Sequence, residues 1–319
     1  MKLGVFTAIL DHQPLESVLD YLQALGVQAV ELGCGGTAGR SHADPALLLN
    51  DPGALQSFRR AIDSHHMEIS ALSCHGNPVH PNPEAARAYD ETIRNTILLA
   101  EKLGIHQINT FSGCPGSDPD AHYPNWVTCP WPEDFQEVLD YQWNQVLIPY
   151  WKKTAAFAAA HGVTQIALEM HPGFCVYNPE TLLRLRAAVG DEIGANLDPS
   201  HLIWQGMDPV AVIRALKGAI FHFHAKDTKI DPYNTAVNGV LDTKPYGDQA
   251  NRSWIFRSVG YGNDLLYWKD IISNLRLAGY DHVVSVEHED GLMSQTEGLA
   301  KACEFLKDII IHEKVGTTQ

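Results

Sequence analysis

Short apolar segments alternate along this chain with segments that have the hydrophobic periodicity of a helix. Eight of the apolar segments are typical of strands, and they cover residues 3–9, 29–34, 68–76, 107–113, 165–171, 193–201, 219–227 and 282–290. Helix-like stretches such as residues 15–26 and 86–104 lie between them. Eight strand–helix units predict an α/β protein with the fold of a (β/α)₈ TIM barrel.

Glycines at the ends of the helix-like stretches support this count. Four of them follow a helical run and precede the next strand, where a left-handed cap residue is expected. These are Gly26, Gly104, Gly162 and Gly279. The repeated stops make the number of units more secure than the assignment of any one strand.

Two other architectures are less consistent with the sequence. A chain of 319 residues could form two small domains, but the unbroken series of units predicts a single barrel domain over residues 1–319. A doubly wound sheet would carry a glycine-rich phosphate turn after its first strand. Residues 9–12 read ILDH instead, so we prefer the closed barrel.

Four of the predicted strands end in side chains that bind metal ions. Units five to eight supply, in chain order, Glu169, Asp198, His224 and Glu287. Any one of them alone would be read as a surface or salt-bridged residue, but the carboxyl ends of barrel strands meet at one face. Three carboxylates grouped there would repel one another without a cation. Oxygen-rich ligation with one imidazole favours Mn²⁺, Mg²⁺ or Co²⁺ over structural zinc, and we expect no organic cofactor.

Further polar side chains at the strand ends are candidates for substrate binding. Histidines at a barrel mouth can hydrogen-bond substrate hydroxyls or shuttle protons, although each could equally be structural. A lysine there could polarise a carbonyl, with a solvated loop charge as the alternative. The candidates are His75, His171, His201 and Lys226. His222 shares a strand face with His224 and is either a core residue or a support for the metal ligand.

Two connections are long, and both follow strands on the predicted active face. Residues 114–140 come after the fourth strand and residues 229–263 after the seventh, and both are rich in Pro, Gly and aromatic residues. Long ordered loops of this kind are commonly lids or binding surfaces. Exposed Trp126, Trp131 and Trp254 would suit sugar stacking or a subunit interface equally well, so both interpretations stay open.

The composition of the sequence limits the kinds of molecule that the protein is expected to bind. No apolar run reaches the roughly 20 residues needed to cross a bilayer, and the first ten residues lead directly into a patterned helix, so we expect a soluble, cytoplasmic protein without a membrane partner. Six cysteines without a CxxC pair indicate reduced thiols. A formal net charge of −15 disfavours nucleic acid. A small, largely neutral molecule rich in hydroxyl groups is easier to accommodate.

At the four metal-capable residues the chain resembles the xylose isomerase-like barrel superfamily of sugar phosphate isomerases and epimerases, over nearly its whole length. The quartet looks like the metal ligands of ketose 3-epimerases such as the tagatose and psicose enzymes, and His201 is similar to their substrate-binding histidine. The chain departs from that pattern at Cys175, where those enzymes have a glutamate, and at Ile230, where they have an arginine. These departures argue against a free ketohexose. A homodimer is compatible with the resemblance.

Two other branches of the superfamily provide comparisons. Endonuclease IV has a histidine after the fourth strand and an Asp-x-His after the seventh, whereas residues 107–113 and 229–234 here read QINTFSG and KIDPYN; with an acidic surface, DNA repair is a poor prediction. A third branch acts on 3-keto sugars and 3-keto glycosides, by epimerisation or by elimination of the aglycone, sometimes with a small partner subunit. We keep that activity as the principal alternative.

The predicted function is that of a metal-dependent sugar isomerase or epimerase. A divalent metal would stabilise the enediolate that forms when a base removes the proton next to a carbonyl. We expect Glu169 and Glu287 to remove and return the proton, Asp198 and His224 to hold the metal, and His201 to orient the substrate. Epimerisation, isomerisation and elimination start from the same enolate, so the sequence does not separate them. A sugar-binding barrel without chemistry is the non-enzyme alternative.

Overall fold

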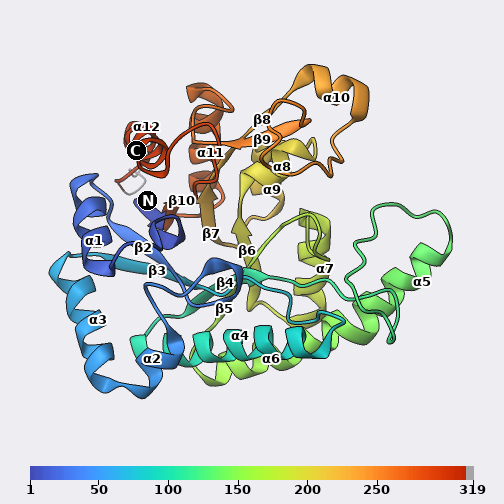
Figure 1. Ribbon diagram of the computed structural model, residues 1–319, viewed down its shortest axis with the longest axis horizontal. Coiled ribbons are helices and arrows are strands. Elements are labelled where there is room, and N and C mark those ends of the chain that lie inside the picture. Colours follow the sequence, from blue (N-terminus) through green and yellow to red (C-terminus); the bar gives the residue numbers. More distant parts are fainter. Residues whose placement is uncertain (314–319) are drawn as a thin grey trace, which may run out of the picture.

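The computed structural model describes residues 1–313, in which eight parallel strands form a closed barrel (Figure 1). Neighbouring strands pair in the order β1-β10-β7-β6-β5-β4-β3-β2, and pairing of Lys2 with Val283 begins the register that closes the barrel. The barrel strands are β1 (Lys2–Phe6), β2 (Ala29–Gly33), β3 (Glu68–Ser73), β4 (Gln107–Phe111), β5 (Gln165–Glu169), β6 (Ile193–Leu197), β7 (Ile220–Ala225) and β10 (Val283–Val286). The predicted (β/α)₈ architecture is therefore confirmed.

Helices surround the barrel or lie in its long connections (Figure 1). They are α1 (Leu15–Ala24), α2 (Pro45–Asn50), α3 (Pro52–Ser64), α4 (Pro83–Leu103), α5 (Asp134–Asp140), α6 (Ile148–Ala160), α7 (Pro179–Val189), α8 (Pro199–Trp204), α9 (Pro209–Ala215), α10 (Pro232–Asn238), α11 (Leu265–Leu277) and α12 (Gln295–Lys307). Short 3₁₀ turns, η1 (Thr7–Leu10) and η2 (Gly36–Ala38), follow β1 and β2, and a π-helical segment, η3 (Tyr141–Leu147), joins α5 to α6. Within residues 1–313, no helix is both long and apolar enough to cross a membrane.

Local sequence explains where the helices begin and end. Seven helices start with an Asp or Asn whose side chain caps the first backbone N–H groups and is followed by Pro at the first helical position. One of these caps is Asp198, at the start of α8. The four predicted glycine stops all have positive φ, as for Gly104 with φ 72° at the end of α4. The sequence signals for helix ends are therefore confirmed.

The barrel has an apolar outer layer and a polar interior. Phe223 of β7 is fully buried in the hydrophobic core, whereas its strand neighbours His222 and His224 point the other way and bond across the barrel. The other polar interior residues, all fully buried, are Glu31, Ser73, Asn109, Asn196 and Ser285. Polar groups of this kind are normally buried only when they are hydrogen-bonded. The barrel interior is therefore a hydrogen-bonded polar network rather than an apolar core.

The two long connections differ from each other. Residues 112–133, after β4, contain no helix or strand, and α5 ends that connection. The segment after β7 contains regular structure, because β8 (Asp227–Ile230) and β9 (Trp254–Arg257) form an antiparallel pair on either side of α10. The expectation that Trp254 is exposed is wrong: only 4% of it is accessible, and its ring stacks on Trp204 with centroids 4.5 Å apart. Trp131 is exposed as expected, and Trp126 is partly buried.

One buried carboxylate anchors the connection after β7. Asp227 is fully buried, and its Oδ2 accepts the indole N–H of Trp268 at 3.0 Å. The same oxygen lies 3.0 Å from each of three backbone N–H donors, which belong to Gly260, Gly262 and Asn263. This carboxylate ties the return of the connection to α11.

We expect Asp227→Ala to lower the free energy of unfolding by at least about 3 kcal/mol, because several buried N–H groups lose their acceptor at about 1–3 kcal/mol each. Urea denaturation followed by circular dichroism measures the change. Asp270→Ala, at an exposed position of α11, is the matched control and should change stability by less than about 0.5 kcal/mol. Equal midpoints for the two variants would contradict the anchoring role.

Candidate metal centre

The structure brings the four metal-capable side chains of the last four barrel strands together. Glu169 is the last residue of β5, Asp198 follows β6 directly, His224 lies in β7, and Glu287 follows β10. Each side chain offers one ligand atom, and these four atoms lie within 4.8 Å of one another. We call these four residues the quartet.

Glu169 is surrounded by imidazoles. Its Oε1 accepts from Nε2 of His201 at 3.0 Å, and its Oε2 lies 3.1 Å from Nε2 of His75 and 3.5 Å from Nδ1 of His224. Burial alone would raise the pKa of Glu169, but hydrogen bonds from these three histidines outweigh it and hold the pKa well below its usual range. Glu169 is therefore a buried anion.

Asp198 has one occupied oxygen and one orphaned oxygen. As the cap of α8, its Oδ1 accepts the backbone N–H of Ser200 at 2.8 Å. Its Oδ2 is buried and has no hydrogen-bond partner of good geometry within residues 1–313, although Nζ of Lys226 lies 3.0 Å away. Burial raises the pKa of Asp198 to about 7, with Lys226 opposing the shift and Glu287 and Glu169 adding to it. Ionisation of Asp198 is thus costly even with the Lys226 ammonium beside it.

Lys226 lies among these carboxylates, and the alternative that it is a solvated loop charge is wrong. Only 2% of the residue is exposed. Its Nζ donates to Oε2 of Glu287 at 2.9 Å and to Oε2 of Glu289 at 3.0 Å. Burial would lower the pKa of Lys226, but Asp198 and Glu287 raise it well above its usual value. For Glu287 the effects have the opposite sign. Burial would raise its pKa, but Lys226 and His224 lower it to about 2.

The three candidate substrate histidines all lie beside the quartet. His201 is on α8 rather than at a strand end, and its Nε2 bridges Glu169 and Asp198 at 3.0 and 3.4 Å. The His171 ring lies 4.0 Å from that of His201, centroid to centroid, and its Nδ1 bonds the carbonyl of Pro172. His75 lies beside Glu169, and its ring centroid is 6.3 Å from that of His224. Of the three, His171 also lines the large hollow described next.

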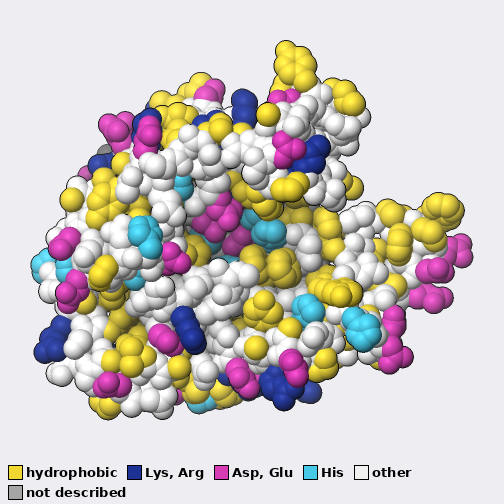
Figure 2. All heavy atoms as spheres, in the orientation of Figure 1, with side chains coloured by type: hydrophobic (Ala, Val, Ile, Leu, Met, Phe, Trp, Pro, Cys, Tyr) yellow, Lys and Arg dark blue, Asp and Glu magenta, His cyan; other side chains and the backbone are white. Residues whose placement is uncertain are grey.

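A hollow with a volume of about 680 Å³ lies at the carboxyl ends of the strands. Figure 2 shows a depression in this face with acidic and histidine side chains on its floor and hydrophobic side chains around it. The lining includes His171, Glu289 and four aromatic rings, those of Phe111, Phe174, Tyr246 and Phe256. Its lining residues, all from the described part of the chain, include neither Lys nor Arg. The hollow therefore suits a neutral ligand with some apolar surface.

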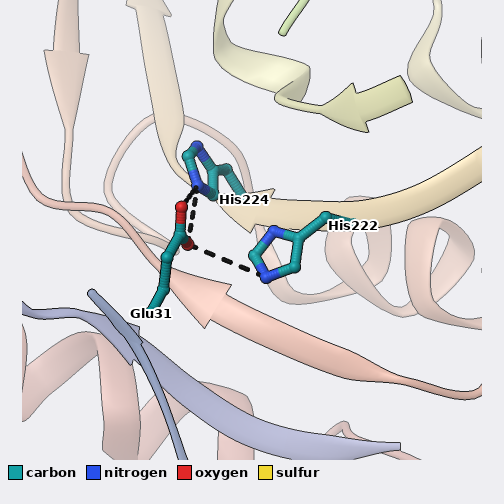
Figure 3. Close-up of side chains that lie close together, drawn as sticks. All are labelled: Glu31, His222 and His224. Atoms are coloured by element: carbon teal, nitrogen blue, oxygen red, sulfur yellow. Dashed lines mark hydrogen bonds and ion pairs between the residues drawn. The ribbon is translucent and has the colours of Figure 1, made fainter. Parts of the chain in front are cut away.

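Glu31 is a functional candidate that sequence reasoning missed. It lies in β2, is fully buried, and contacts Nε2 of His224 through both carboxylate oxygens, at 2.9 and 3.0 Å (Figure 3). Burial would raise the pKa of Glu31, but His224 and His222 lower it. A glutamate at the centre of the apolar segment 29–34 was the available signal, since a barrel strand is covered on both faces.

The donor set fits a divalent cation. Three carboxylates and one imidazole offer ligand atoms within 4.8 Å of one another, and one of these carboxylates, Asp198, has a buried oxygen without a hydrogen-bond partner among the described residues. The carboxylates also outnumber the cationic groups among them. Such oxygen-rich sites suit Mg²⁺, Mn²⁺ and related ions. In this structure Lys226 and His224 partly offset the negative charge, because Glu31 and Glu287 hold the pKa of His224 well above its usual value against the effect of burial.

Comparisons with known proteins agree with the barrel fold. The model of the family described as xylose isomerase-like TIM barrel matches residues 19–309. The uncharacterized protein YfiH of Bacillus subtilis (strain 168) is 42% identical over 312 residues, which cover 97% of this chain and 99% of YfiH. The inosose dehydratase of Geobacillus thermodenitrificans (strain NG80-2) is 25% identical over 170 residues, covering 52% of this chain and 54% of that protein.

Solved structures share the fold. The probable 3-DHS dehydratase AsbF of Bacillus anthracis has a TM-score of 0.67 at 18% identity, covering 96% of this chain and 99% of AsbF. An IolI protein with a bound zinc atom has a TM-score of 0.67, and a D-tagatose 3-epimerase-like protein has 0.64. Both are 20% identical, with coverage of 97% of this chain and 98% of the other. Epimerases and dehydratases therefore both occur on this fold.

Proposed function

Because the chain belongs to the xylose isomerase-like TIM barrel family, we propose that it is a metal-dependent enzyme that removes a proton next to a carbonyl of a small polyhydroxylated ketone. The favoured outcome is isomerisation or epimerisation, in which the proton is returned to the substrate. The observation that carries the proposal is the convergence of Glu169, Asp198, His224 and Glu287 within 4.8 Å. Mn²⁺, Mg²⁺ or Co²⁺ is the expected metal, and a zinc atom is bound in the IolI structure.

Two carboxylates of the quartet can act as bases. A divalent ion held by the quartet would supply Lewis-acid stabilisation of the negative charge that develops on the substrate oxygen. Glu287 is the more accessible carboxylate, with 15% of its side chain exposed against 4% for Glu169. We assign removal of the proton to Glu287 and its return to Glu169, which lies at the end of β5 and is separated from β10 by the two strands β7 and β6.

The neighbouring side chains position the substrate. His201, between Glu169 and Asp198, can orient a hydroxyl or the carbonyl, and His171 lines the hollow that the substrate would enter. The Lys226 ammonium can stabilise negative charge that develops near Glu287. Since neither Lys nor Arg lines the hollow among the described residues, we propose a neutral substrate rather than a sugar phosphate.

Elimination is the second candidate, and Lys226 favours it. After the proton is removed, loss of a hydroxyl from the neighbouring carbon gives an unsaturated ketone, and the departing oxygen needs a positive or proton-bearing group. Nζ of Lys226 lies 2.9 Å from the proposed base, so it is placed to stabilise that oxygen. The inosose dehydratase and AsbF similarities support this chemistry. Loss of the aglycone from a 3-keto glycoside is the same reaction with a larger leaving group.

Solvent exchange tests the shared first step. The protein is incubated in D₂O with Mn²⁺ and a panel of a free ketohexose, an inosose and a 3-keto glycoside, and deuterium uptake is followed by NMR. We expect deuterium next to the carbonyl of at least one neutral ketone, with a new stereocentre, a shifted carbonyl or an alkene identifying the outcome. The same panel measured after treatment with a chelator is the control.

Three results would overturn parts of the proposal. Binding of panel members without any exchange would favour a sugar-binding barrel. If a ketohexose phosphate is added to the panel, exchange into that compound alone would contradict the proposal of a neutral substrate. Undiminished exchange after verified removal of divalent ions would contradict the proposal that the reaction requires a metal.

A further inference from the structure

Glu31 contacts the one imidazole of the quartet from the side away from the other ligands. His224 lies between two acidic neighbours: its Nε2 is 2.9 and 3.0 Å from the Glu31 oxygens, and its Nδ1 is 3.0 Å from Oε2 of Glu287. In Figure 3, both His222 and His224 project from the same strand toward the Glu31 carboxylate. The two nitrogens of His224 therefore face different carboxylates.

The Glu31 carboxylate is itself held by donors from several strands. It accepts from Ser73 of β3 at 2.5 Å, from Asn109 of β4 at 2.9 Å and from Ser285 of β10 at 2.9 Å. Every one of these partners donates a proton, so both oxygens can only accept. The network spans the barrel interior and leaves the carboxylate little freedom to move.

This geometry determines which nitrogen of His224 can bind a cation. When a cation replaces the second proton of His224, the remaining proton is required on Nε2 for the bond to Glu31. The lone pair available to the cation is then on Nδ1, the nitrogen that faces Glu169 and Glu287. A carboxylate behind a ligating histidine holds the ring orientation and increases its basicity. The arrangement here provides both effects from a residue that no ligand pattern in the sequence includes.

We propose that Glu31 is a positioning residue that keeps the proton of His224 on Nε2 and presents Nδ1 to the metal of the quartet. The proposal rests on the proposed function only in requiring that the quartet binds a divalent ion. Glu31, His222 and His224 also form a compact group of their own. That group is a support rather than a second metal site, because Glu31 already accepts from three further donors and Nδ1 of His222 bonds Asn196 at 3.1 Å.

Metal affinity tests the proposal independently of activity. We expect Glu31→Gln to bind Mn²⁺ about 10- to 100-fold more weakly than the wild type, as measured by calorimetry and by electron paramagnetic resonance of free Mn²⁺ after removal of bound ions. Ser285→Ala is the matched control, because it removes one donor to Glu31 and leaves the His224 contact. Its affinity should stay within about threefold.

A measurement on the unmodified protein covers the case in which Glu31→Gln does not fold. Long-range ¹H–¹⁵N correlation spectra of the Zn²⁺-loaded protein should show His224 with a proton on Nε2. A proton on Nδ1 of His224, or equal Mn²⁺ affinity of folded Glu31→Gln and wild type, would overturn the role of Glu31. Failure of the wild type to bind Mn²⁺ or Zn²⁺ would overturn both this inference and the proposal that the quartet binds a metal. Tight metal binding without solvent exchange would contradict only the proposed function.

Discussion

Substitution of Glu287 by glutamine is expected to lower the rate of deuterium exchange into the substrate by about 10³-fold, within the range that a general base contributes. The amide keeps the shape of the side chain and one oxygen, but it cannot accept the substrate proton. Glu287 is the partly exposed carboxylate of the quartet, and its pKa is lowered to about 2 against the effect of burial by Lys226 and His224. It is therefore ionised at neutral pH and ready to act.

Loss of the metal must be separated from loss of the base. Exchange by Glu287→Gln is measured at increasing Mn²⁺ concentration, so that the comparison is made with the site saturated. Glu297→Gln is the control, because Glu297 is exposed on α12, where it pairs with Lys301, and lies outside both the quartet and the lining of the hollow; we expect less than a fivefold change, about 1 kcal/mol in barrier. Normal exchange by saturated Glu287→Gln would remove Glu287 from the base role.

The barrel and the quartet could be predicted from the sequence because both depend on local patterns. Alternating strand and helix periodicity determines the fold class, and the parallel barrel then brings all strand ends to one face. A carboxylate or imidazole at the end of a strand therefore meets its equivalents from other strands, as Glu169 and Glu287 do. The distance in sequence between these residues is irrelevant to this argument.

Residues that depend on contacts across the barrel could not be predicted in the same way. Glu31 lies inside a strand, and its partners come from four other strands, so no short motif identifies it. Lys226 follows a metal-capable histidine by two positions, but its burial depends on the connection after β7, where Phe256 lies 4.8 Å from its Nζ. Trp254 is buried for the same reason, since that connection folds as a strand pair.

Removal of bound divalent ions should lower the rate of deuterium exchange into the substrate by at least about 10³-fold, while the protein stays folded. Metal-generated stabilisation of charge on the substrate amounts to several kcal/mol, so its loss alone is sufficient for this decrease. The fold should persist because Lys226 and His224, whose pKa values are both raised well above their usual range by the neighbouring carboxylates, offset negative charge in the quartet. Chelation followed by circular dichroism and an exchange assay, with re-addition of Mn²⁺, measures both. Unfolding on chelation would instead indicate a structural metal.

Lys226→Met should make the fold depend on the metal. In the variant without metal, Asp198 and Glu287 lose a cation that lies 3.0 and 2.9 Å away, and removing one partner of a buried ion pair costs about 3–5 kcal/mol. Addition of Mn²⁺ restores a positive charge at the same carboxylates, so we expect it to raise the melting temperature of Lys226→Met far more than that of the wild type. Lys301→Met, at an exposed ion pair, is the control and should behave like the wild type. An equal response of Lys226→Met and wild type to Mn²⁺ would show that the lysine and the cation do not share these carboxylates.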